Sequence, residues 1–337
     1  MKAIMYHNSG SADVLKLEEI EKPVPKDDEV LIKVRAASVN PLDCHLLKHP
    51  LLRRVMTALS KVKITRPGRD VAGVISEGMD TVGRNVTQFK PGDEVFGACS
   101  GAFAEYACAR DSALAMKPHN VSFEQAASTP VAGLTALQGL RDKGQIQRGQ
   151  KVLINGAAGG VGTFAVQIAK SFSAEVTGVC STRNVELVRS IGADKVIDYT
   201  REDFTSNGQH YDVIFDLVAN HSFSEHRRVL TPRGIYIGAG ILGGSLIGVL
   251  TSWIAQLVMF PFVSQKFGSF MAKLNQKDLT AIGALMEEGK VTPVIDRRYR
   301  LTEAPEAVRY VAEQHASGKV VIDFVPPHDL SLNSGEQ

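Results

Sequence analysis

The sequence predicts an α/β fold in which a small strand-rich region is joined to a larger region built on a parallel sheet. Short β-branched runs bounded by turn residues dominate residues 1–121. From Ser122 onward, buried strands alternate with helical patterns, which is typical of βαβ units. A glycine-rich turn that links the first of these strands to the next helix supports the same fold class.

Turn residues and β-branched runs place the strands of the first region. The segment at 30–34 is Val-Leu-Ile-Lys-Val, and Pro91-Gly92-Asp93 is a turn that precedes the strand at 94–97. We expect strands at 1–7, 30–34, 71–77, 94–97 and 103–109.

The second region repeats a strand and a helix several times. Ser122 begins the first helical stretch. We expect strands at 152–154, 176–180, 196–197, 213–215, 235–237 and 320–324, and helices at 163–171, 184–191, 277–288 and 303–316. Gly289 and Gly318 stand after the last two helices, where a left-handed cap residue belongs.

Composition limits the class of protein. A chain of 337 residues predicts about two domains, and its formal net charge of +2 gives no reason to expect a nucleic acid or an anionic membrane as a partner. The N-terminus lacks the apolar core of a signal peptide. The cysteines have neither C-x-x-C nor zinc-finger spacing, so we expect reduced thiols in a cytoplasmic protein; they are Cys44, Cys99, Cys108 and Cys180.

The run from 234 to 265 carries no charged residue and could suggest a membrane span. Its first part reads as a strand, however, and Gly243-Gly244 and Pro261 interrupt the rest. Between them lies an apolar stripe at helical spacing: Leu246, Leu250, Trp253, Leu257 and Phe260. We expect segment 241–263 to cover a pocket, form a homodimer contact or touch a membrane surface, and no stable membrane insertion.

The strongest motif is Asn155-Gly156-Ala157-Ala158-Gly159-Gly160-Val161-Gly162, between a strand and a helix. The dinucleotide-binding pattern G-x-G-x-x-G falls on Ala157, Gly159 and Gly162, with alanine at the first position. Gly159 would let the backbone approach a pyrophosphate, and Gly162 would let the helix pack closely on the strand. The free N–H groups of the helix N-terminus would then bind the phosphates, so we expect cofactor contacts from Ala158, Gly159, Gly160, Val161 and Gly162.

The end of the next strand favours NADPH over NADH. Enzymes that bind NAD hold the ribose 2′-hydroxyl with an acid there, whereas residues 176–185 contain none. Ser181, Thr182 and Arg183 instead offer hydroxyls and a guanidinium to a 2′-phosphate. The alternative is that Ser181 caps the helix and Arg183 is merely solvated.

Several segments together resemble the medium-chain dehydrogenase/reductase superfamily, in particular its quinone oxidoreductase branch. They include Ala37–Asp43 (ASVNPLD), Pro67–Val74 (PGRDVAGV), Phe89–Asp93 (FKPGD), Gly133–Ala136 (GLTA), the glycine-rich turn and Gly192-Ala193-Asp194. The resemblance implies a GroES-like β domain and a Rossmann doubly wound domain. We expect the GroES-like catalytic domain at 1–121 and 266–337, and the NADPH-binding domain at 122–265.

The same resemblance predicts that no metal is bound. Zinc enzymes of this superfamily have a cysteine ligand where this chain has Asn40, and a His-Glu pair at Arg69-Asp70. Asn40 and Arg69 cannot complete a catalytic zinc site. Quinones and activated enones accept hydride without such a metal.

The resemblance also proposes site residues. Asn40, Asp43 and His45 are the candidate catalytic residues, although Asn40 could serve only as a turn residue, Asp43 only as a helix cap and His45 only as an exposed side chain. Relatives often have a tyrosine after the Asn-Pro pair, whereas this chain has His45 and His49. Further cofactor contacts are expected from Asn40, Thr135, Tyr199, Val218 and Gly240.

These observations predict a zinc-free, NADPH-dependent oxidoreductase that transfers hydride to a quinone or another α,β-unsaturated carbonyl. One alternative is a reductase of enoyl thioesters or alkenals, which would share every cofactor residue. The other is an NADPH-binding sensor or structural protein with little turnover.

Overall fold

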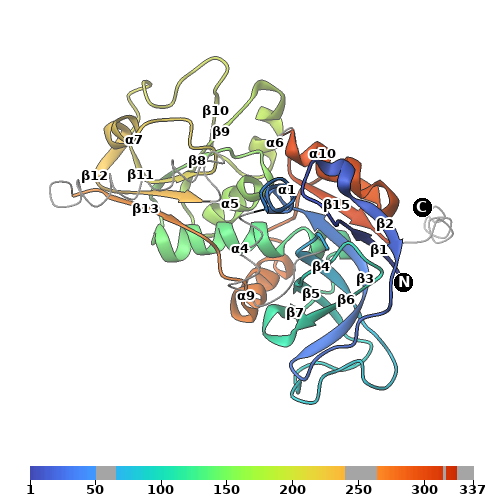
Figure 1. Cartoon of the computed structure of the whole chain (residues 1–337). Coiled ribbons are helices and arrows are strands. Elements are labelled where there is room, and N and C mark those ends of the chain that lie inside the picture. Colours follow the sequence, from blue (N-terminus) through green and yellow to red (C-terminus); the bar gives the residue numbers. More distant parts are fainter. Residues whose placement is uncertain (51–65, 240–263, 314–315, 325–337) are drawn as a thin grey trace, which may run out of the picture. The chain divides into compact units, whose positions relative to one another are not determined.

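The computed structural model describes residues 1–50, 66–239, 264–313 and 316–324 (Figure 1). The chain forms two compact units. The first unit comprises Met1–Pro130, Ile295–Ala316 and Val320–Gln337, and the second comprises Val131–Val294 with Ser317–Lys319. The chain therefore leaves the first unit, builds most of the second, and returns.

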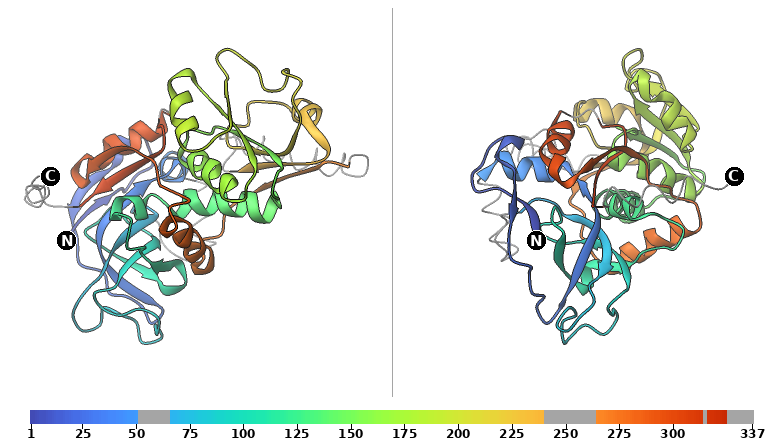
Figure 2. Two further views of the ribbon diagram at one scale, coloured as in Figure 1. Left: turned by 180° about the vertical axis from the view of Figure 1, so that it is seen from behind. Right: turned by 90° about the vertical axis from the view of Figure 1, so that its right-hand side faces the viewer.

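The first unit is a β structure made from both ends of the chain. Its strands are β1 (Lys2–Met5), β2 (Lys16–Glu19), β3 (Glu29–Val39), β4 (Asp70–Ile75), β5 (Glu94–Ala98), β6 (Tyr106–Arg110), β7 (Leu114–Met116), β14 (Ile295–Arg300) and β15 (Lys319–Asp323). A seven-stranded sheet has the order β14-β15-β3-β4-β5-β7, with β6 also paired to β3, while β1 and β2 form a separate hairpin. Figures 1 and 2 show the red strand β15 beside the blue N-terminal strands, as the antiparallel pairing of β15 with β3 requires.

The helices described in this unit are α1 (Pro41–Lys48), α3 (Phe123–Ala127) and α10 (Ala304–Ala312). Ser122 caps α3 as expected, because its hydroxyl accepts the N–H of Gln125. Helix α1 packs on α10 over an apolar core that β3 and β15 also line.

The second unit is a doubly wound parallel sheet. Its strands are β8 (Lys151–Asn155), β9 (Glu175–Cys180), β10 (Lys195–Asp198), β11 (Tyr211–Asp216), β12 (Leu230–Ala239) and β13 (Lys266–Phe270). They lie in the order β10-β9-β8-β11-β12-β13, which is the Rossmann order. The helices described there are α4 (Pro130–Gln138), α5 (Gly160–Ser171), α6 (Val185–Ser190), α7 (Phe223–Val229) and α9 (Gln276–Glu287), and α5 packs on β8 and β9.

The observed division of the chain differs from the one expected at residues 122 and 265. Helix α3 packs on β3, β4 and β5, so the first unit continues to Pro130. Strand β13 pairs in parallel with β12, which keeps residues 266–294 in the second unit.

Two smaller expectations also need correction. Helix α5 begins at Gly160 and not at residue 163, because the second half of the glycine-rich motif is already helical. Gly318 has a φ of +112°, but α10 ends at Ala312, so Gly318 is not its cap. Gly289 does adopt a φ of +68° just after α9.

The apolar segment 241–263, with Trp253 and its stripe, lies outside the described residues, as do Gly240 and the tail from residue 325. Within the described part of the chain, no helix has both the length and the apolar character needed to cross a bilayer.

Candidate active site

The glycine-rich turn begins with a backbone that only glycine adopts easily. Gly156 follows β8 with a φ of +89°. The next residue, Ala157, is fully buried, and a β-carbon at Gly178 of β9 would lie 3.0 Å from its own. The tight turn is therefore made at Gly156, which explains why alanine is accepted at the first position of the motif.

Gly159 and Gly162 have different physical roles. A β-carbon at Gly162 would lie 2.1 Å from the carbonyl oxygen of Gly156, so the helix approaches the turn too closely for any side chain. At Gly159 the nearest atom would be that same oxygen at 3.4 Å, which is ordinary contact. The protein itself therefore leaves Gly159 open, as the backbone approach of a pyrophosphate requires.

Gly159 is also the N-cap of α5, so the amides of the first turn, from Gly160 and Val161, have no carbonyl partner within the helix. A β-carbon at Gly160 would lie 3.0 Å from Cδ of Lys319, a buried lysine that returns to this unit from the far end of the chain. Open glycine backbone and a helix N-terminus fit the pyrophosphate of a dinucleotide.

The strand order of the sheet reverses between β8 and β11, where ligands of doubly wound proteins bind. At this point Nδ2 of Asn155 donates to Oδ1 of Asp216 at 2.9 Å and to Oδ1 of Asn220 at 2.9 Å. The same Asp216 oxygen accepts the amides of Val218 at 3.0 Å and Ala219 at 2.9 Å. The two loops that follow β8 and β11 are thus fixed to one carboxylate.

Val218, an expected cofactor contact, is 48% exposed on this loop. A β-carbon at Gly156 would lie 2.9 Å from its Cγ2, so the side chain borders the glycine-rich turn. The structure therefore brings Val218 to the same edge as Gly159.

Asp216 has further partners that sequence reasoning did not identify. Its Oδ2 accepts the hydroxyl of Tyr236 at 2.9 Å and lies 3.4 Å from Nε2 of the buried His226. Burial would raise the pKa of Asp216, but His226 and the amides of Ala219 and Val218 outweigh it and lower the pKa to about 2. The carboxylate is ionised at any physiological pH.

The end of β9 contains the residues expected to recognise a 2′-phosphate. Thr182 and Arg183 are exposed and Ser181 is half-buried. The hydroxyl of Thr182 already donates to Oδ2 of Asp198 at 2.6 Å. A hydroxyl has one proton to donate, so Thr182 cannot give a phosphate that hydrogen bond without leaving Asp198.

Asp198 is an acid that lies beyond residues 176–185 in the sequence but close to them in the sheet. It ends β10 in register with Cys180 at the end of β9. The hydroxyls of Thr182 and Thr200 lower its pKa against the opposing effect of burial. The sequence feature that could have identified Asp198 is an acid at the end of β10, the strand that pairs with β9.

Tyr199 and Thr135 have partners of their own. The amide of Tyr199 donates to the carbonyl of Cys180 at 3.0 Å, while its side chain is 61% exposed. The hydroxyl of Thr135 donates to the carbonyl of Val131 in its own helix at 2.7 Å, which leaves only its lone pairs for a ligand. The cofactor roles of both residues stay predictions.

In the first unit, Asn40, Asp43 and Asp70 form one buried network. Nδ2 of Asn40 donates to Oδ2 of Asp70 at 2.9 Å, and the hydroxyl of Ser38 donates to the same oxygen at 2.8 Å. The Asp43 carboxylate accepts hydrogen bonds from the backbone N–H of Asn40 at 2.8 Å and from the backbone N–H of Gly68 at 3.1 Å. Asp43 therefore caps α1 and also holds the loop that precedes β4.

Two of the candidate catalytic residues have shifted pKa values. Burial raises the pKa of Asp43 to about 6, with a contribution from Asp70, although the amides of Asn40 and Gly68 oppose it. Partial burial lowers the pKa of His45, and His49 and Lys48 lower it further. His45 is therefore mostly neutral at pH 7.

The donors at the family's zinc positions do not suit zinc. The Asn40 amide nitrogen donates a hydrogen bond, and the Arg69 guanidinium has no lone pair to offer. Burial also raises the pKa of the adjacent Cys44 thiol to about 12. In the residues that the structure describes, no three His, Cys, Asp or Glu side chains gather as metal ligands.

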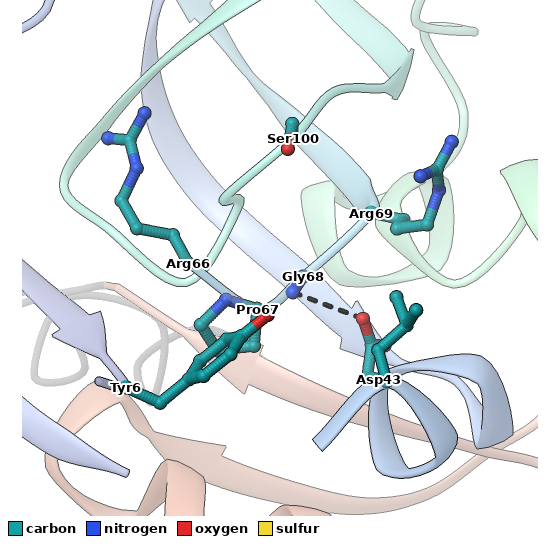
Figure 3. Close-up of a pocket in the computed structure, with 8 residues that line it drawn as sticks. Tyr6, Asp43, Arg66, Pro67, Gly68, Arg69 and Ser100 are labelled. Carbon is teal, nitrogen blue, oxygen red and sulfur yellow. Dashed lines mark hydrogen bonds between the residues drawn. The ribbon is translucent and has the colours of Figure 1, made fainter. Parts of the chain in front are cut away.

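A small pocket of the first unit adjoins this network (Figure 3). It is lined by Tyr6, Asp43, Arg66, Gly68, Arg69 and Ser100, among others. Figure 3 shows Asp43 bound to Gly68 on one side of the pocket, with Arg66 and Arg69 extending from the same loop on either side of Ser100.

Comparison with known proteins identifies both parts of the chain. Residues 26–119 match the alcohol dehydrogenase GroES-like domain, and residues 191–322 match a family described as zinc-binding dehydrogenase. Among solved structures, a quinone oxidoreductase from Coxiella burnetii superposes with a TM-score of 0.84 and is 30% identical, covering 96% of this chain and 99% of that one.

Two relatives that match most of this chain are oxidoreductases by name. A chloroplastic NADPH-dependent alkenal/one oxidoreductase of Arabidopsis thaliana is 35% identical over 341 residues, covering 97% of this chain and 80% of the relative. A 2-methylene-furan-3-one reductase of Solanum lycopersicum is 36% identical over 341 residues, with the same coverage of 97% and 80%.

Proposed function

Because the chain belongs to the quinone oxidoreductase-like branch of the medium-chain dehydrogenase/reductase family, we propose that it transfers hydride from NADPH to a quinone or another α,β-unsaturated carbonyl. The observation that carries the proposal is the open Gly159 at the N-terminus of α5, beside the point where the strand order reverses.

Several residues of the second unit would hold the cofactor. The first-turn amides of α5 would bind the pyrophosphate, and Val218 would contact the cofactor from the loop after β11. A bound nicotinamide cofactor supplies the hydride. The protein then has to position the acceptor against the nicotinamide and to exclude competing reactions.

The residues of the first unit would serve the acceptor. The Asn40–Asp43–Asp70 network fixes the start of α1 and the loop at Gly68, so the side chains on these segments are held in place. Reduction of a quinone or an enone also consumes a proton. Asp43, with a pKa of about 6, and the half-buried His45 are the candidates that could relay it.

The preference for NADPH rests on Arg183 and on the absence of an acid at the end of β9. Asp198, the acid that ends β10, opposes this preference, since its charge would repel a 2′-phosphate placed near Thr182. We propose that Arg183 outweighs it, because a guanidinium can bind phosphate through two hydrogen bonds.

Among the α,β-unsaturated carbonyls, enones and alkenals are favoured by the names of the plant relatives, an alkenal/one oxidoreductase and a 2-methylene-furan-3-one reductase. Independence of zinc is proposed from the chemistry of Asn40 and Arg69. A homodimer and a cytoplasmic location are proposed from the sequence alone.

Steady-state NADPH oxidation with a panel of acceptors tests the function. The panel consists of a benzoquinone, a 2-alkenal, an enone and an enoyl thioester, and NADPH binding is followed separately by its fluorescence. We expect turnover with the quinone or the enone. Tight NADPH binding without turnover of any acceptor would contradict the proposal and support a binding protein instead.

A further inference from the structure

Three hydrogen-bond donors that line the pocket of the first unit have no acceptor among the residues that the structure describes. They are the guanidinium groups of Arg66 and Arg69 and the hydroxyl of Ser100. In the described part of the chain, none of the three makes a side-chain hydrogen bond or an ion pair. Residues 51–65, which precede Arg66 in the sequence, contain no Asp or Glu that could provide a partner.

Backbone contacts fix the loops that carry these donors. Gly101, with a φ of +85°, lies against Arg66: a β-carbon there would be 2.9 Å from both Cβ and Nε of the arginine. Gly101 and Ala102 also donate their amides to the carbonyl of Gly68, at 2.9 and 3.1 Å. The loop that carries Ser100 is thus bonded to the loop that carries Arg66 and Arg69.

Both arginines influence the same neighbouring thiol. Burial raises the pKa of Cys99 to about 12, while the charges of Arg69 and Arg66 oppose that rise. The one carboxylate that lines the pocket is Asp43, and its two oxygens already accept the amides of Asn40 and Gly68. Two guanidinium groups against one occupied carboxylate leave the pocket positively charged at neutral pH.

We propose that Arg66, Arg69 and Ser100 bind an oxyanion group, a carboxylate or a phosphate, that is part of the electron acceptor. Guanidinium groups bind such oxyanions in pairs of parallel hydrogen bonds, and a hydroxyl adds a third donor. The physiological acceptor is then an acidic quinone or enone, not a neutral one. This inference rests on the proposed function and names its substrate class.

A matched pair of acceptors tests the inference. The pair is a benzoquinone with a carboxyalkyl side chain and the methyl ester of the same compound, which differ in charge and little in reactivity. We expect the parent protein to have a KM for the acid lower than that for the ester by about tenfold or more, as for hydrogen bonds to a charged group. Arg69→Gln should bring the ratio of the two KM values close to one.

Arg110→Gln is the control, because Arg110 is exposed in the same unit and lies 3.5 Å from Asp28, away from the pocket residues. It should preserve the acid-to-ester ratio. NADPH affinity, measured by fluorescence, should be equal in Arg69→Gln and the parent, which shows that the variant is folded.

The outcomes separate the two proposals. Equal KM values for acid and ester in the parent overturn the acidic acceptor and leave the oxidoreductase intact. No turnover of either compound, with NADPH bound, means that the proposed function itself has failed. Inorganic phosphate should compete with the acid; if phosphate inhibits but acid and ester still have equal KM values, the pocket binds free anions only, which also overturns the inference.

Discussion

Asn155 and Asp216 are joined by a hydrogen bond of 2.9 Å, at the carboxyl ends of the two strands between which the sheet order reverses. Each residue also holds the loop after β11, Asn155 through Asn220 and Asp216 through the amides of Val218 and Ala219. The edge of the sheet where a dinucleotide would bind is therefore organised by one buried polar pair.

Replacing Asp216 should weaken cofactor binding. An amide cannot accept all the hydrogen bonds that converge on this carboxylate, so Asp216→Asn frees the loop at Val218 and costs about 1–3 kcal/mol of stability. We expect weaker NADPH binding in fluorescence titrations. Asp212→Asn is the control, because Asp212 lies at the other end of β11 and accepts the Lys151 amide at 2.9 Å. If Asp216→Asn binds NADPH as tightly as Asp212→Asn does, Asp216 does not position the loop at Val218 for the cofactor.

Gly159 and Gly162 should respond differently to the same substitution. Gly162→Ala forces a β-carbon against the Gly156 carbonyl and should lower the free energy of unfolding by about 1–3 kcal/mol or more. Gly159→Ala has room within the protein and should stay within about 1 kcal/mol of the parent. It should nevertheless lose NADPH affinity, because the added methyl group blocks the pyrophosphate. Thermal denaturation and NADPH titration distinguish the two, and normal binding by Gly159→Ala would show that the phosphates lie elsewhere.

Arg183 should determine the choice of cofactor. Arg183→Ala removes a guanidinium from the 2′-phosphate and should raise the Kd for NADPH by about tenfold or more while leaving that for NADH nearly unchanged. Arg189→Ala is the matched control, since Arg189 is an exposed arginine paired with Glu186 at 2.8 Å. If the parent binds NADPH and NADH equally well, the predicted preference is wrong.

The raised pKa of Asp43 should appear in the pH dependence of stability. Since the folded protein raises this pKa from 3.8 to about 6, the folded state binds the proton more tightly than the unfolded state does. The contribution of Asp43 to stability is then full below pH 3.8 and is lost as the pH rises through 6. Asp43→Asn does not titrate, so the stability of the parent relative to the variant should fall by about 2 kcal/mol between pH 4 and pH 7. Urea unfolding at several pH values measures this difference, and a constant difference would refute it.

Activity should not depend on zinc. The side-chain amide of Asn40 donates a hydrogen bond to Asp70, and Arg69 cannot act as a zinc ligand. Exhaustive chelation should therefore leave NADPH oxidation unchanged. Elemental analysis of the active protein provides the second measurement. One zinc ion per chain, with activity that chelation abolishes, would overturn the prediction.

Local patterns were enough to predict the parallel sheet and its glycine-rich turn. Buried β-branched runs are visible in sequence, and the motif marks where the first strand passes into a helix. Strand β13 was missed because its sequence, Lys-Phe-Gly-Ser-Phe, is short and mixed, and only pairing with β12 makes it a strand. The domain boundary at 265 failed for the same reason.

The polar contacts of the site could not be read from the chain. Asp198 meets Thr182 only because β10 pairs with β9 in a particular register. The group of Asp216, Tyr236 and His226 forms through packing between β11, β12 and α7. The sequence does show that Asp198 and Asp216 each end a strand, and an acid at the end of a strand is the pattern by which both could have been identified as site residues.

The return of the chain to its first unit has a consequence for synthesis on the ribosome. Strand β3 lies between β4 and β15 in the sheet, but β15 begins only at Lys319. The strands described for the parallel sheet are all translated by Phe270, so that sheet can form while residues 36–39 of β3, which pair with β15, still lack that partner. An exposed strand edge invites pairing with other chains. The nascent protein therefore carries its aggregation risk in the strands made first, until the last strand is translated and covers them.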